Sequence, residues 1–456
     1  MRQITLLKRR CKKAGRNNGH FKHHTFPSSA QEINNPTNTF STFFTFCTFL
    51  LSAHSALKFL FLSNRIPYPP FRGDKLKIYN LAKRLAAKGH TLHLITFMEE
   101  AGDEQYRPEL EQIFEKVVLV HLPKRRAGMN VLGGVVSRLP FQVSYFKSKE
   151  MQRKLNTLLQ QERYDAVHVQ HLRMAPYLEH RADLPRILDL PDAFSLYWQR
   201  RKAVKKNPLK KSAESWEAGR VFRYEQQVLQ RFNRTLCCSA EDLKYLQEKH
   251  GADNLSLLPN GVDLATFYPK NHDYSHNHTL LFTGNMDYAP NVDAVVYFCK
   301  EVLPLIRKKQ PQVKFVIAGQ RPVAAVKALA QEVEHVAVTG FVADLTELYN
   351  AASVVVAPLR FGAGTQNKVL EAMAMGIPVV CSHIGFGGLG IENGEGAIMR
   401  TDVVSFADAV VHLLDSEAAR KALGEKAARV IEARFGWDAI AALLEQYLKE
   451  VAIAGR

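Results

Sequence analysis

The stretch SVVVAPLRFGAGTQNKVLEAMAMGIPVV, residues 353–380, contains the pattern that decides the fold. An apolar run is followed by a glycine-rich turn, then by a helix-like segment that Gly376 ends, then by a second apolar run. A strand, a helix and another strand in this order predict two parallel strands joined by a crossover helix. In such sheets a ligand binds at the carboxyl ends of the strands, where the glycine-rich turn lies.

The glycine-rich turn has the composition of an anion-binding loop. Glycines let backbone amides approach an anion closely, and the start of the following helix adds about half a positive charge. Lys368 stands in the first helical turn, and Glu371, three residues later, shares its face. The cation suits a diphosphate and the carboxylate suits the hydroxyls of a ribose. The pattern therefore favours a nucleotide site, while the same glycines also fit a simple tight turn with Lys368 in solvent.

Strand-like runs recur along the chain in two series separated by helix-like segments. They lie at 58–63, 91–97, 117–122, 165–170, 186–190 and 234–239, and then at 279–284, 314–319, 336–340, 353–359 and 377–382. The alternation predicts two Rossmann-like α/β domains with a cleft between them, and 456 residues are too many for one core. We expect an N-terminal domain over 57–265, a linker over 266–278, a C-terminal domain over 279–436 and a final helix within 437–456.

The net charge indicates which kinds of partner the protein binds, and the cysteine content indicates its cellular compartment. The formal net charge of +17 favours anionic partners: phosphates, acidic lipid headgroups or nucleic acid. No nucleic-acid recognition motif is present, so we expect no nucleic-acid partner. The six cysteines form no C-x-x-C pair and no zinc-ligand array, so we expect reduced thiols and a cytoplasmic protein.

Residues 1–56 differ in composition from the rest of the chain. They contain eight Lys or Arg and one acid, Glu32, and their apolar run 40–53 is too short to span a bilayer. Three interpretations fit: a disordered extension, a weak membrane-surface anchor, or sequence upstream of the true start. We favour the last, because a self-contained domain begins at Leu57. Mass spectrometry of the native N-terminus tests this, since a peptide from 1–56 would exclude it.

Four stretches share their pattern with a known family: YPPFRGDK (68–75), LLPNGVDLATFYP (257–269), LFTGNMDYAPNVDAV (281–295) and the block 340–380. Together they resemble glycosyltransferase family 4. The resemblance covers residues 57–450, and its finer pattern is similar to sugar transferases of the PEP-CTERM/exosortase systems in exopolysaccharide-producing bacteria. It implies the GT-B fold, in which a C-terminal helix crosses back to the N-terminal domain. It also implies retaining transfer of a sugar from a UDP- or GDP-sugar to a glycan or a polyprenyl-diphosphate-linked acceptor.

The resemblance assigns roles in both halves of the chain. Glu371 matches the second Glu of the family's E-x7-E motif, which binds the donor ribose. His171 lies near the family's cleft histidine, although Gln170 fits equally, and it either orients the reacting groups or only packs. The remaining donor-side positions contact the phosphates, follow the first strand of the donor domain or hold the base: Gly73, Gly284, Phe341, Leu345 and the loop amides of Gly364, Thr365 and Gln366.

The sequence also departs from the family pattern. Ala363 stands where the first Glu of E-x7-E is expected, and Asn285 and Asn291 stand roughly where an Arg and a Lys are usual. We expect Lys368 to supply the missing charge, with Arg321 or Arg360 as helpers. Without an Asp-x-Asp motif we expect no metal and no cofactor besides the donor. The departures leave two rival functions: a non-catalytic nucleotide-sugar-binding protein and a nucleotide-sugar epimerase of the same fold.

Two further features suggest an acceptor side. Asp189 and Asp192 lie at the end of a predicted strand and face the same cleft, where they either contact the acceptor or cap the next helix. The stretch 200–211 has seven basic residues in twelve. It is either a solvated helix or a patch that contacts anionic lipid at the inner face of the plasma membrane, and we lean to the second because a lipid-linked acceptor lies there.

Overall fold

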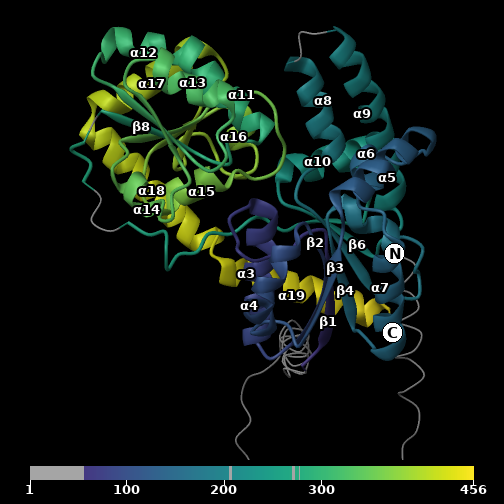
Figure 1. The fold of residues 1–456 in the computed structure, drawn as a ribbon. Helices are drawn as coiled ribbons and strands as arrows, with labels where there is room; N and C mark the ends of the chain where they lie inside the picture. The colour runs from purple at the N-terminus through teal and green to yellow at the C-terminus, as the bar shows by residue number, and fades with distance from the viewer. Residues whose placement is uncertain (1–55, 205–207, 270–272, 277, 456) are drawn as a thin grey trace, which may run out of the picture. The chain divides into compact units, whose positions relative to one another are not determined.

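The computed structural model describes residues 56–204, 208–269, 273–276 and 278–455 (Figure 1). The interpretation of residues 1–56 therefore concerns a segment that, except for Ala56, lies outside the described residues. Both sheets belong to one compact unit, Ala56–Arg456, so the domain boundaries at 265 and 279 stay predictions.

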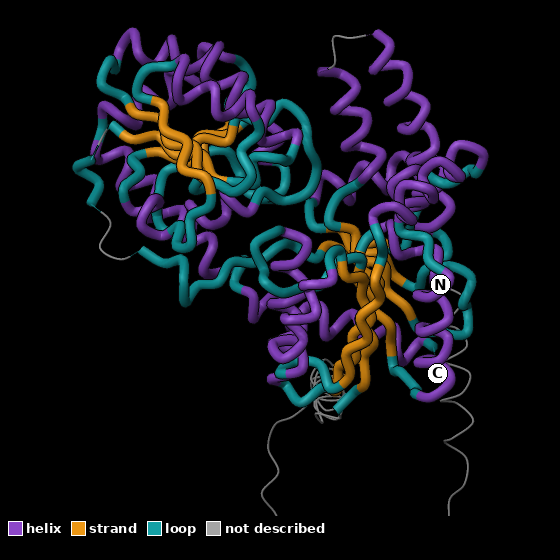
Figure 2. Tube along the Cα trace, in the orientation of Figure 1, coloured by secondary structure: helices purple, strands orange, loops and turns teal. Residues whose placement is uncertain are grey.

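The first seven strands form one parallel sheet (Figure 2). The strand order is β3-β2-β1-β4-β5-β6-β7, and every neighbouring pair is parallel. The bounds are β1 (Lys58–Ser63), β2 (Thr91–Met98), β3 (Lys116–His121), β4 (Ala166–Gln170), β5 (Arg186–Leu190), β6 (Arg234–Cys237) and β7 (Leu255–Leu257).

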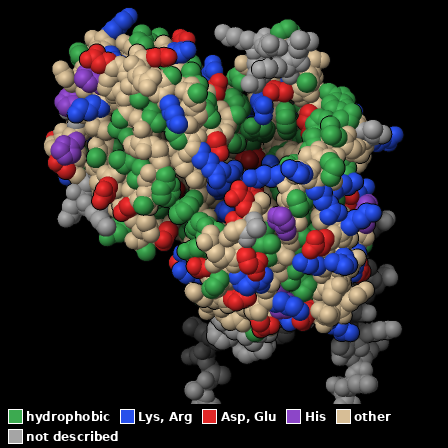
Figure 3. All heavy atoms as spheres, in the orientation of Figure 1, with side chains coloured by type: hydrophobic (Ala, Val, Ile, Leu, Met, Phe, Trp, Pro, Cys, Tyr) green, Lys and Arg blue, Asp and Glu red, His purple; other side chains and the backbone are tan. Residues whose placement is uncertain are grey.

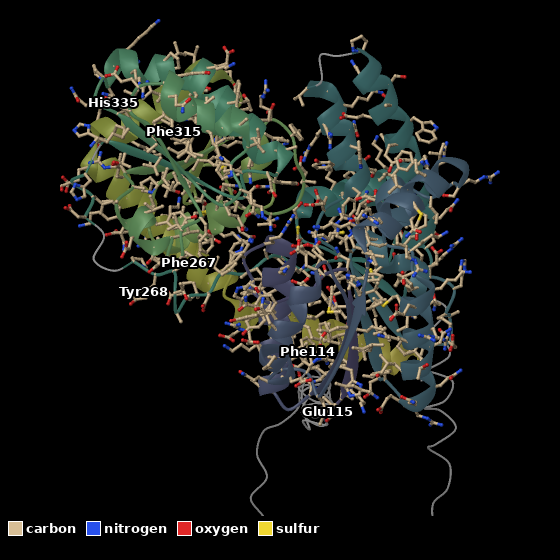
Figure 4. The ribbon with its side chains drawn as sticks, viewed as in Figure 1. Phe114, Glu115, Phe267, Tyr268, Phe315 and His335 are labelled. Carbon is tan, nitrogen blue, oxygen red and sulfur yellow. The ribbon has the colours of Figure 1, made fainter. Side chains whose placement is uncertain are left out.

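Helices cover this first sheet and bury both of its faces. Successive side chains of a strand point to opposite faces, so Phe59 and Phe61 of β1 enter one core while Leu60 and Leu62 enter another. Phe114, labelled in Figure 4, packs edge-on against Phe61. The helical elements are α3 (Gly73–Ala87), η1 (Ala101–Tyr106), α4 (Arg107–Glu111), α5 (Lys124–Val136), α6 (Phe141–Tyr145), α7 (Lys149–Gln161), η2 (Leu172–Tyr177), α8 (Phe194–Val204), α9 (Pro208–Leu229) and α10 (Ala240–His250).

The remaining strands form a second parallel sheet of order β10-β9-β8-β11-β12-β13. Phe315 of β9, also labelled in Figure 4, lies in its core against Phe298. The strands are β8 (Thr279–Thr283), β9 (Lys314–Ala318), β10 (Val336–Gly340), β11 (Val354–Ala357), β12 (Val379–Cys381) and β13 (Ala397–Met399). The helical elements are α11 (Ala289–Tyr297), η3 (Phe298–Val302), α12 (Leu303–Lys309), α13 (Ala324–Glu332), α14 (Thr346–Asn350), α15 (Asn367–Ala374), α16 (His383–Phe386), α17 (Val403–Asp415) and α18 (Glu417–Arg434).

The last helix, α19 (Trp437–Ala454), packs on the first sheet rather than the second. Trp437, Leu444 and Leu448 are buried in the core that also holds Phe59 and Phe61. Ion pairs fix the helix at both ends, from Arg84 to Asp438 at 2.8 Å and from Arg234 to Glu450 at 2.8 Å. The predicted return of the C-terminal helix to the N-terminal domain is therefore confirmed.

All eleven predicted strands are present, and two further strands were not predicted. The two additions, β7 and β13, have three residues each and lie at the edges of their sheets. The edge strands β3 and β10 have six and five residues and were predicted, so it is the length of three residues that leaves too short a run for the sequence pattern to mark. Across the described part of the chain, no helix is both long enough and apolar enough to span a bilayer.

Candidate functional site

The candidate site lies where the strand order of each sheet reverses. In the second sheet β8 and β11 are neighbours, and the glycine-rich loop leaves the end of β11 beside Gly284 at the end of β8. In the first sheet β1 and β4 are neighbours, and their ends lead to the loop before Gly73 and to His171. Such switch points are the usual ligand sites of parallel sheets.

The glycine-rich loop is held against groups of the first sheet. The amide of Gly364 donates to Asp242 Oδ2 at 3.0 Å, and the amide of Thr365 donates to Cys238 Sγ at 3.3 Å. The hydroxyl of Thr365 also donates to the carbonyl of Cys238 at 2.7 Å. Two of the amides expected at the pyrophosphate are thus engaged by protein groups in this structure.

Gly364 is required at its position for two reasons. Its φ of +73° lies in the left-handed region that side chains disfavour. A Cβ at this position would also lie 2.3 Å from Asp192 Oδ1 and 2.6 Å from the carbonyl of Pro191. The close approach places the Asp192 carboxylate directly beside the loop.

Lys368 is buried at the start of α15, which excludes the interpretation that places it in solvent. Its Nζ lies 3.2 Å from Asn291 Oδ1 and 3.2 Å from Gln366 Oε1, and 5.1 Å from the centre of the Phe282 ring. Burial lowers its pKa to about 8 against the opposing effect of Glu371. Among the described residues Lys368 forms no ion pair, so the hydrogen-bond partners of this buried cation are neutral and Glu371 offsets its charge without bonding to it.

Glu371, one turn further along α15, is oriented by a chain of hydroxyl groups. Tyr349 Oη donates to Glu371 Oε2 at 2.9 Å and lies 2.9 Å from Thr283 Oγ1 at the end of β8. Burial raises the pKa of Glu371, while Tyr349 and Lys368 oppose the increase. The carboxylate is therefore positioned next to the end of β8, with one oxygen that accepts from Tyr349.

The turn after β8 brings two backbone segments very close together. A Cβ at Gly319 would lie 1.7 Å from the carbonyl oxygen of Gly284, so only glycine fits there. The side chain of Asn291 donates to the carbonyl of Asn285 at 3.0 Å, and Gln320 donates to Asn285 Oδ1 at 2.7 Å. Asn291 thus lies beside the Lys368 ammonium, and the replacement of the family's cation by Lys368 stays a prediction.

The two proposed helper arginines lie in different environments. Arg360 forms two hydrogen bonds to Asp293, at 2.8 and 2.5 Å, and stacks over Tyr297, so its charge is already compensated. Arg321 is exposed, has a φ of +56° and lies 3.6 Å from Asp287. Of the three predicted cations, Lys368 alone is buried at the loop.

Two contacts join the motif YPPFRGDK (68–75) to residues of the predicted donor side. A Cβ at Gly73 would lie 3.4 Å from Asn367 Nδ2, and Asn367 Oδ1 accepts from Asn260 at 2.9 Å. The rings of Phe71 and Phe341 meet edge-on with centroids 5.5 Å apart, although each is more than half exposed. Leu345, the other residue predicted at the base, is half-buried at the start of α14.

His171 follows β4 with a strained backbone and a neutral ring. Its φ is +81°, a conformation that non-glycine residues rarely adopt and that is often retained for function. Nδ1 accepts from the amide of Arg173 at 3.2 Å, and the ring packs on Phe194 at 4.5 Å. Burial, with Arg173 and Arg65, holds the pKa of His171 well below its usual value.

Gln170, the alternative to His171, has a structural contact on each side of its amide. Its Nε2 donates to the carbonyl of Asp74 at 2.6 Å, and its Oε1 accepts from Ser63 at 3.1 Å. These contacts fix the first turn of α3 against β1. Within the described residues the Nε2 of His171 has no hydrogen-bond partner, so the structure favours His171 as the group available to a ligand.

The two aspartates of the LDLPD segment have different environments. Asp189 is buried in contact with Lys77 Nζ at 2.7 Å and His168 Nε2 at 3.2 Å, so it neither faces an acceptor nor caps a helix. Asp192 lies beside Gly364, and burial together with Asp242 raises its pKa to about 8. The structure therefore keeps Asp192 at the site and gives Asp189 a role in the core.

The basic stretch 200–211 is only partly described. Arg200 donates to the carbonyl of Gly362 at 3.0 Å and pairs with Glu241, and Arg201 pairs with Glu214 at 2.9 Å. Residues 205–207 and the side chains of Leu209 and Lys210 lie outside the described part. Arg200 is thus a contact of the glycine-rich loop rather than a free surface cation.

Sequence reasoning missed several groups at the site: Asp242, Cys238, Arg173 and Asn367. Asp242 stands in the first turn of α10, where an acid is expected simply from the positive helix terminus. Arg173 lies two residues after His171 and has a pKa lowered by burial to about 10. The closeness of Arg173 to His171 in the sequence was the one signal that could have identified a missed group. Among the described residues, no cluster of three or more His, Cys, Asp or Glu could hold a metal.

Two family models match adjoining parts of the chain. Residues 78–266 match the model described as Glycosyltransferase Family 4, and residues 277–416 match the model described as Glycosyl transferases group 1. The two matches together cover well over half of the chain and include every strand of both sheets except β1. The first match ends at residue 266 and the second begins at residue 277, so the predicted linker at 266–278 separates them.

Known proteins similar to the chain include one curated protein and two solved structures. The first is an uncharacterized 44.6 kDa protein of the cps region of Klebsiella pneumoniae, 24% identical over 78% of this chain and 90% of that protein. The sucrose-phosphate synthase of Thermosynechococcus elongatus has a TM-score of 0.68 at 17% identity, over 87% of this chain and 100% of that one. Anabaena HepE, solved with UDP-glucose, has a TM-score of 0.63 at 17% identity, over 86% and 100%. The two structures confirm the predicted GT-B fold.

Proposed function

We propose, from the premise that the chain belongs to glycosyltransferase family 4, that it transfers a sugar from a nucleotide-diphosphate donor with retention of configuration. The acceptor we propose is a glycan or a polyprenyl-diphosphate-linked sugar. Binding of UDP and UDP-glucose by the structural neighbour HepE supports a nucleotide-sugar donor. A GDP-sugar is an equal alternative to a UDP-sugar as the donor.

One observation carries the proposal: Lys368 is a buried cation whose partners in the described structure are neutral. Burying a charge without a directly bonded counter-ion is costly, and Glu371, which forms no ion pair with Lys368, offsets that cost only in part. Such a site is suited to an anionic ligand. Lys368 lies at the switch point of the second sheet, where a diphosphate is expected. Glu371, oriented by Tyr349, lies one turn away and suits the two hydroxyls of a ribose.

The reaction follows from these positions. The bond between the anomeric carbon and the diphosphate oxygen breaks, and its electron pair leaves with the diphosphate. Lys368 stabilises that charge in a dry site, as preorganised cations do in phosphoryl leaving-group chemistry. The acceptor oxygen attacks from the same face, and its proton passes to the departing phosphate oxygen. We expect no metal requirement.

His171 is proposed to orient the acceptor hydroxyl or the donor sugar. Its low pKa keeps the ring neutral, and the bond from Arg173 to Nδ1 leaves Nε2 as the N–H donor. A neutral N–H can hold a sugar hydroxyl without adding a charge. The strained φ of His171 supports a role in binding rather than in packing alone.

We further propose a role in surface-polysaccharide assembly, in a system of the PEP-CTERM/exosortase type. The motif resemblance and the cps-region protein of Klebsiella pneumoniae support this role. A lipid-linked acceptor would place the chain at the inner face of the plasma membrane.

Calorimetric titration with UDP and GDP, with and without EDTA, tests the donor site. We expect one nucleotide to bind without metal, and Lys368→Ala and Glu371→Ala each to weaken binding roughly tenfold or more, the loss typical of one charge-assisted contact. Arg360→Ala is the matched control, because that cation is paired with Asp293. If neither nucleotide binds, or the two variants bind like the wild type, the donor-site assignment is wrong.

Product analysis then separates transfer from its rivals. Incubation with the nucleotide sugar that binds and a membrane extract should give a glycosylated acceptor. An altered donor without any acceptor would indicate an epimerase. Tight binding without any product would favour a non-catalytic binding protein, an alternative that Ala363 supports because the family's Glu is absent there.

A further inference from the structure

Helix α5 buries Ala127 and Gly134 and exposes three large apolar residues. Met129, Leu132 and Val135 are 64%, 72% and 54% exposed, and their spacing of three places them along one face. No other helix in the described part of the chain exposes more than one large apolar side chain. An ordinary surface helix has the reverse arrangement, so this face is suited to an apolar environment other than the core.

The small residues of α5 explain why the helix cannot simply rotate. Ala127 is fully buried, and a Cβ at Gly134 would lie 3.0 Å from Ser144 Oγ and 3.3 Å from the Phe141 ring of α6. Asn130 donates to the carbonyl of Lys147 at 2.8 Å. The inward face therefore has no room for the large residues, and these contacts fix them outward.

The end of α5 is also held by α9. Arg220 donates to the carbonyls of Gly134, Ser137 and Leu139 and stacks over Phe141 and Trp216. Trp216 is itself 47% exposed and packs on Phe141. Figure 3 shows apolar side chains gathered over the region of α5, α6 and α9, with basic side chains beside them.

The charged residues of the segment that contains α5 are of one sign. Residues 122–149 contain six Lys or Arg and no Asp or Glu. Arg125, Arg126 and Arg138 are exposed and form no ion pair within the described structure, whereas Lys124 pairs with Glu100 at 3.0 Å. Unpaired cations beside exposed apolar side chains are complementary to an anionic lipid surface, in which headgroups meet the cations and acyl chains meet the apolar residues.

We propose that the apolar face of α5, formed by Met129, Leu132 and Val135 with the flanking Arg125 and Arg126, docks on an anionic bilayer. This surface differs from the stretch 200–211, whose Arg200 and Arg201 are engaged inside the protein. A second copy of the chain is a less suitable partner for this face, because the cations of two identical faces would repel each other. The docking requires neither donor nor sugar transfer, so it can fail independently of the proposed function.

Vesicle co-sedimentation of the full chain tests the docking. The probes are vesicles of equal parts phosphatidylglycerol and phosphatidylcholine, and vesicles of phosphatidylcholine alone. We expect binding to the first, and a loss of roughly thirtyfold for Arg125→Gln with Arg126→Gln. We expect a loss of about tenfold or more for Met129→Gln with Leu132→Gln, since Gln preserves helix propensity while removing apolar contact.

Matched controls keep the result specific to α5. Val404→Gln with Ile453→Gln removes two equally exposed apolar side chains elsewhere, and Lys308→Gln with Lys327→Gln removes two unpaired exposed cations. Both control pairs should bind vesicles like the wild type, and all variants should keep the wild-type melting temperature. Binding of the α5 variants equal to the wild type, or no binding to anionic vesicles, overturns the proposal. So does a change from dimer to monomer in sedimentation without any change in vesicle binding.

Discussion

The backbone amide of Gly364 donates a hydrogen bond to the carboxylate of Asp242, at 3.0 Å, so a protein anion occupies an amide of the glycine-rich loop. Asp242 also accepts from the amide of Ala193 at 3.0 Å, and burial raises its pKa to about 6. At neutral pH the carboxylate is therefore charged and lies where we expect the donor diphosphate to approach. Its charge opposes binding of the diphosphate.

Asp242→Asn should therefore tighten nucleotide binding. The asparagine oxygen still accepts the hydrogen bond, but one negative charge is removed, which at high effective dielectric is worth about 1 kcal/mol or roughly fivefold in affinity. Calorimetry with UDP and GDP at pH 7.5 measures the change. Glu248→Gln, at the exposed far end of α10, is the control and should have no effect. If the Asp242→Asn variant binds the nucleotide no more tightly than the wild type, the diphosphate does not lie at this loop.

Nucleotide affinity should fall as pH rises through the pKa of Lys368. Burial lowers that pKa to about 8, and a bound diphosphate favours the protonated form. By linkage the affinity is full below about pH 7 and declines at higher pH, by at most about tenfold per pH unit. Lys368→Met should bind more weakly and show a flat profile from pH 7 to 9. A wild-type profile without a decline above pH 8 contradicts the role of Lys368.

The sequence predicts the central strands well because their residues are buried on both faces. β1, β4 and β5 are apolar runs or nearly so, and each was predicted within one residue of its bounds. The strands β7 and β13 were missed since a run of three residues carries little pattern. The glycines of the loop and the helix stop at Gly376 were also readable, because each has a positive φ that glycine favours.

The candidate site was less predictable because its contacts join distant segments. Glu371 and Lys368 were identified from their spacing, but nothing in the sequence near Gly364 indicates that Asp242, 122 residues earlier, accepts its amide hydrogen bond. Asp189 shows the opposite failure. Its position at the end of a strand suggested a role at the cleft, whereas Lys77, 112 residues away, pairs with it in the core.

Removing either partner of the buried Lys77–Asp189 pair should strongly destabilise the first sheet. The two side chains are 2% and 1% exposed, and removing one partner leaves the other charge buried. We expect Lys77→Met or Asp189→Asn to lower the free energy of unfolding by about 3–5 kcal/mol. Lys58→Met, which breaks the half-exposed pair with Glu162, should cost less than about 1 kcal/mol. Urea denaturation compares them, and equal losses would contradict the structure.

Asp192 should make the protein less stable as pH rises from about 4 to about 8. Burial and the charge of Asp242 raise its folded pKa to about 8 from an ordinary value of 3.8, while Arg173 opposes the increase. In that window the native state keeps a proton that the unfolded state has lost, so the free energy of unfolding falls with pH and is constant above the window. Asp192→Asn has no proton to lose and should escape the decline.

Relative to the wild type, Asp192→Asn should therefore gain at least about 1.4 kcal/mol in free energy of unfolding between pH 5 and pH 8, the equivalent of one pKa unit. Urea denaturation at the two pH values measures the gain. Asp183→Asn is the control with the opposite sign, because the hydrogen bond from Arg181 lowers the pKa of that exposed carboxyl. Its stability difference from the wild type should stay constant from pH 5 to pH 8, above both pKa values. Parallel curves for Asp192→Asn and the wild type would mean that the carboxylate beside Gly364 is charged at pH 5 and hydrated.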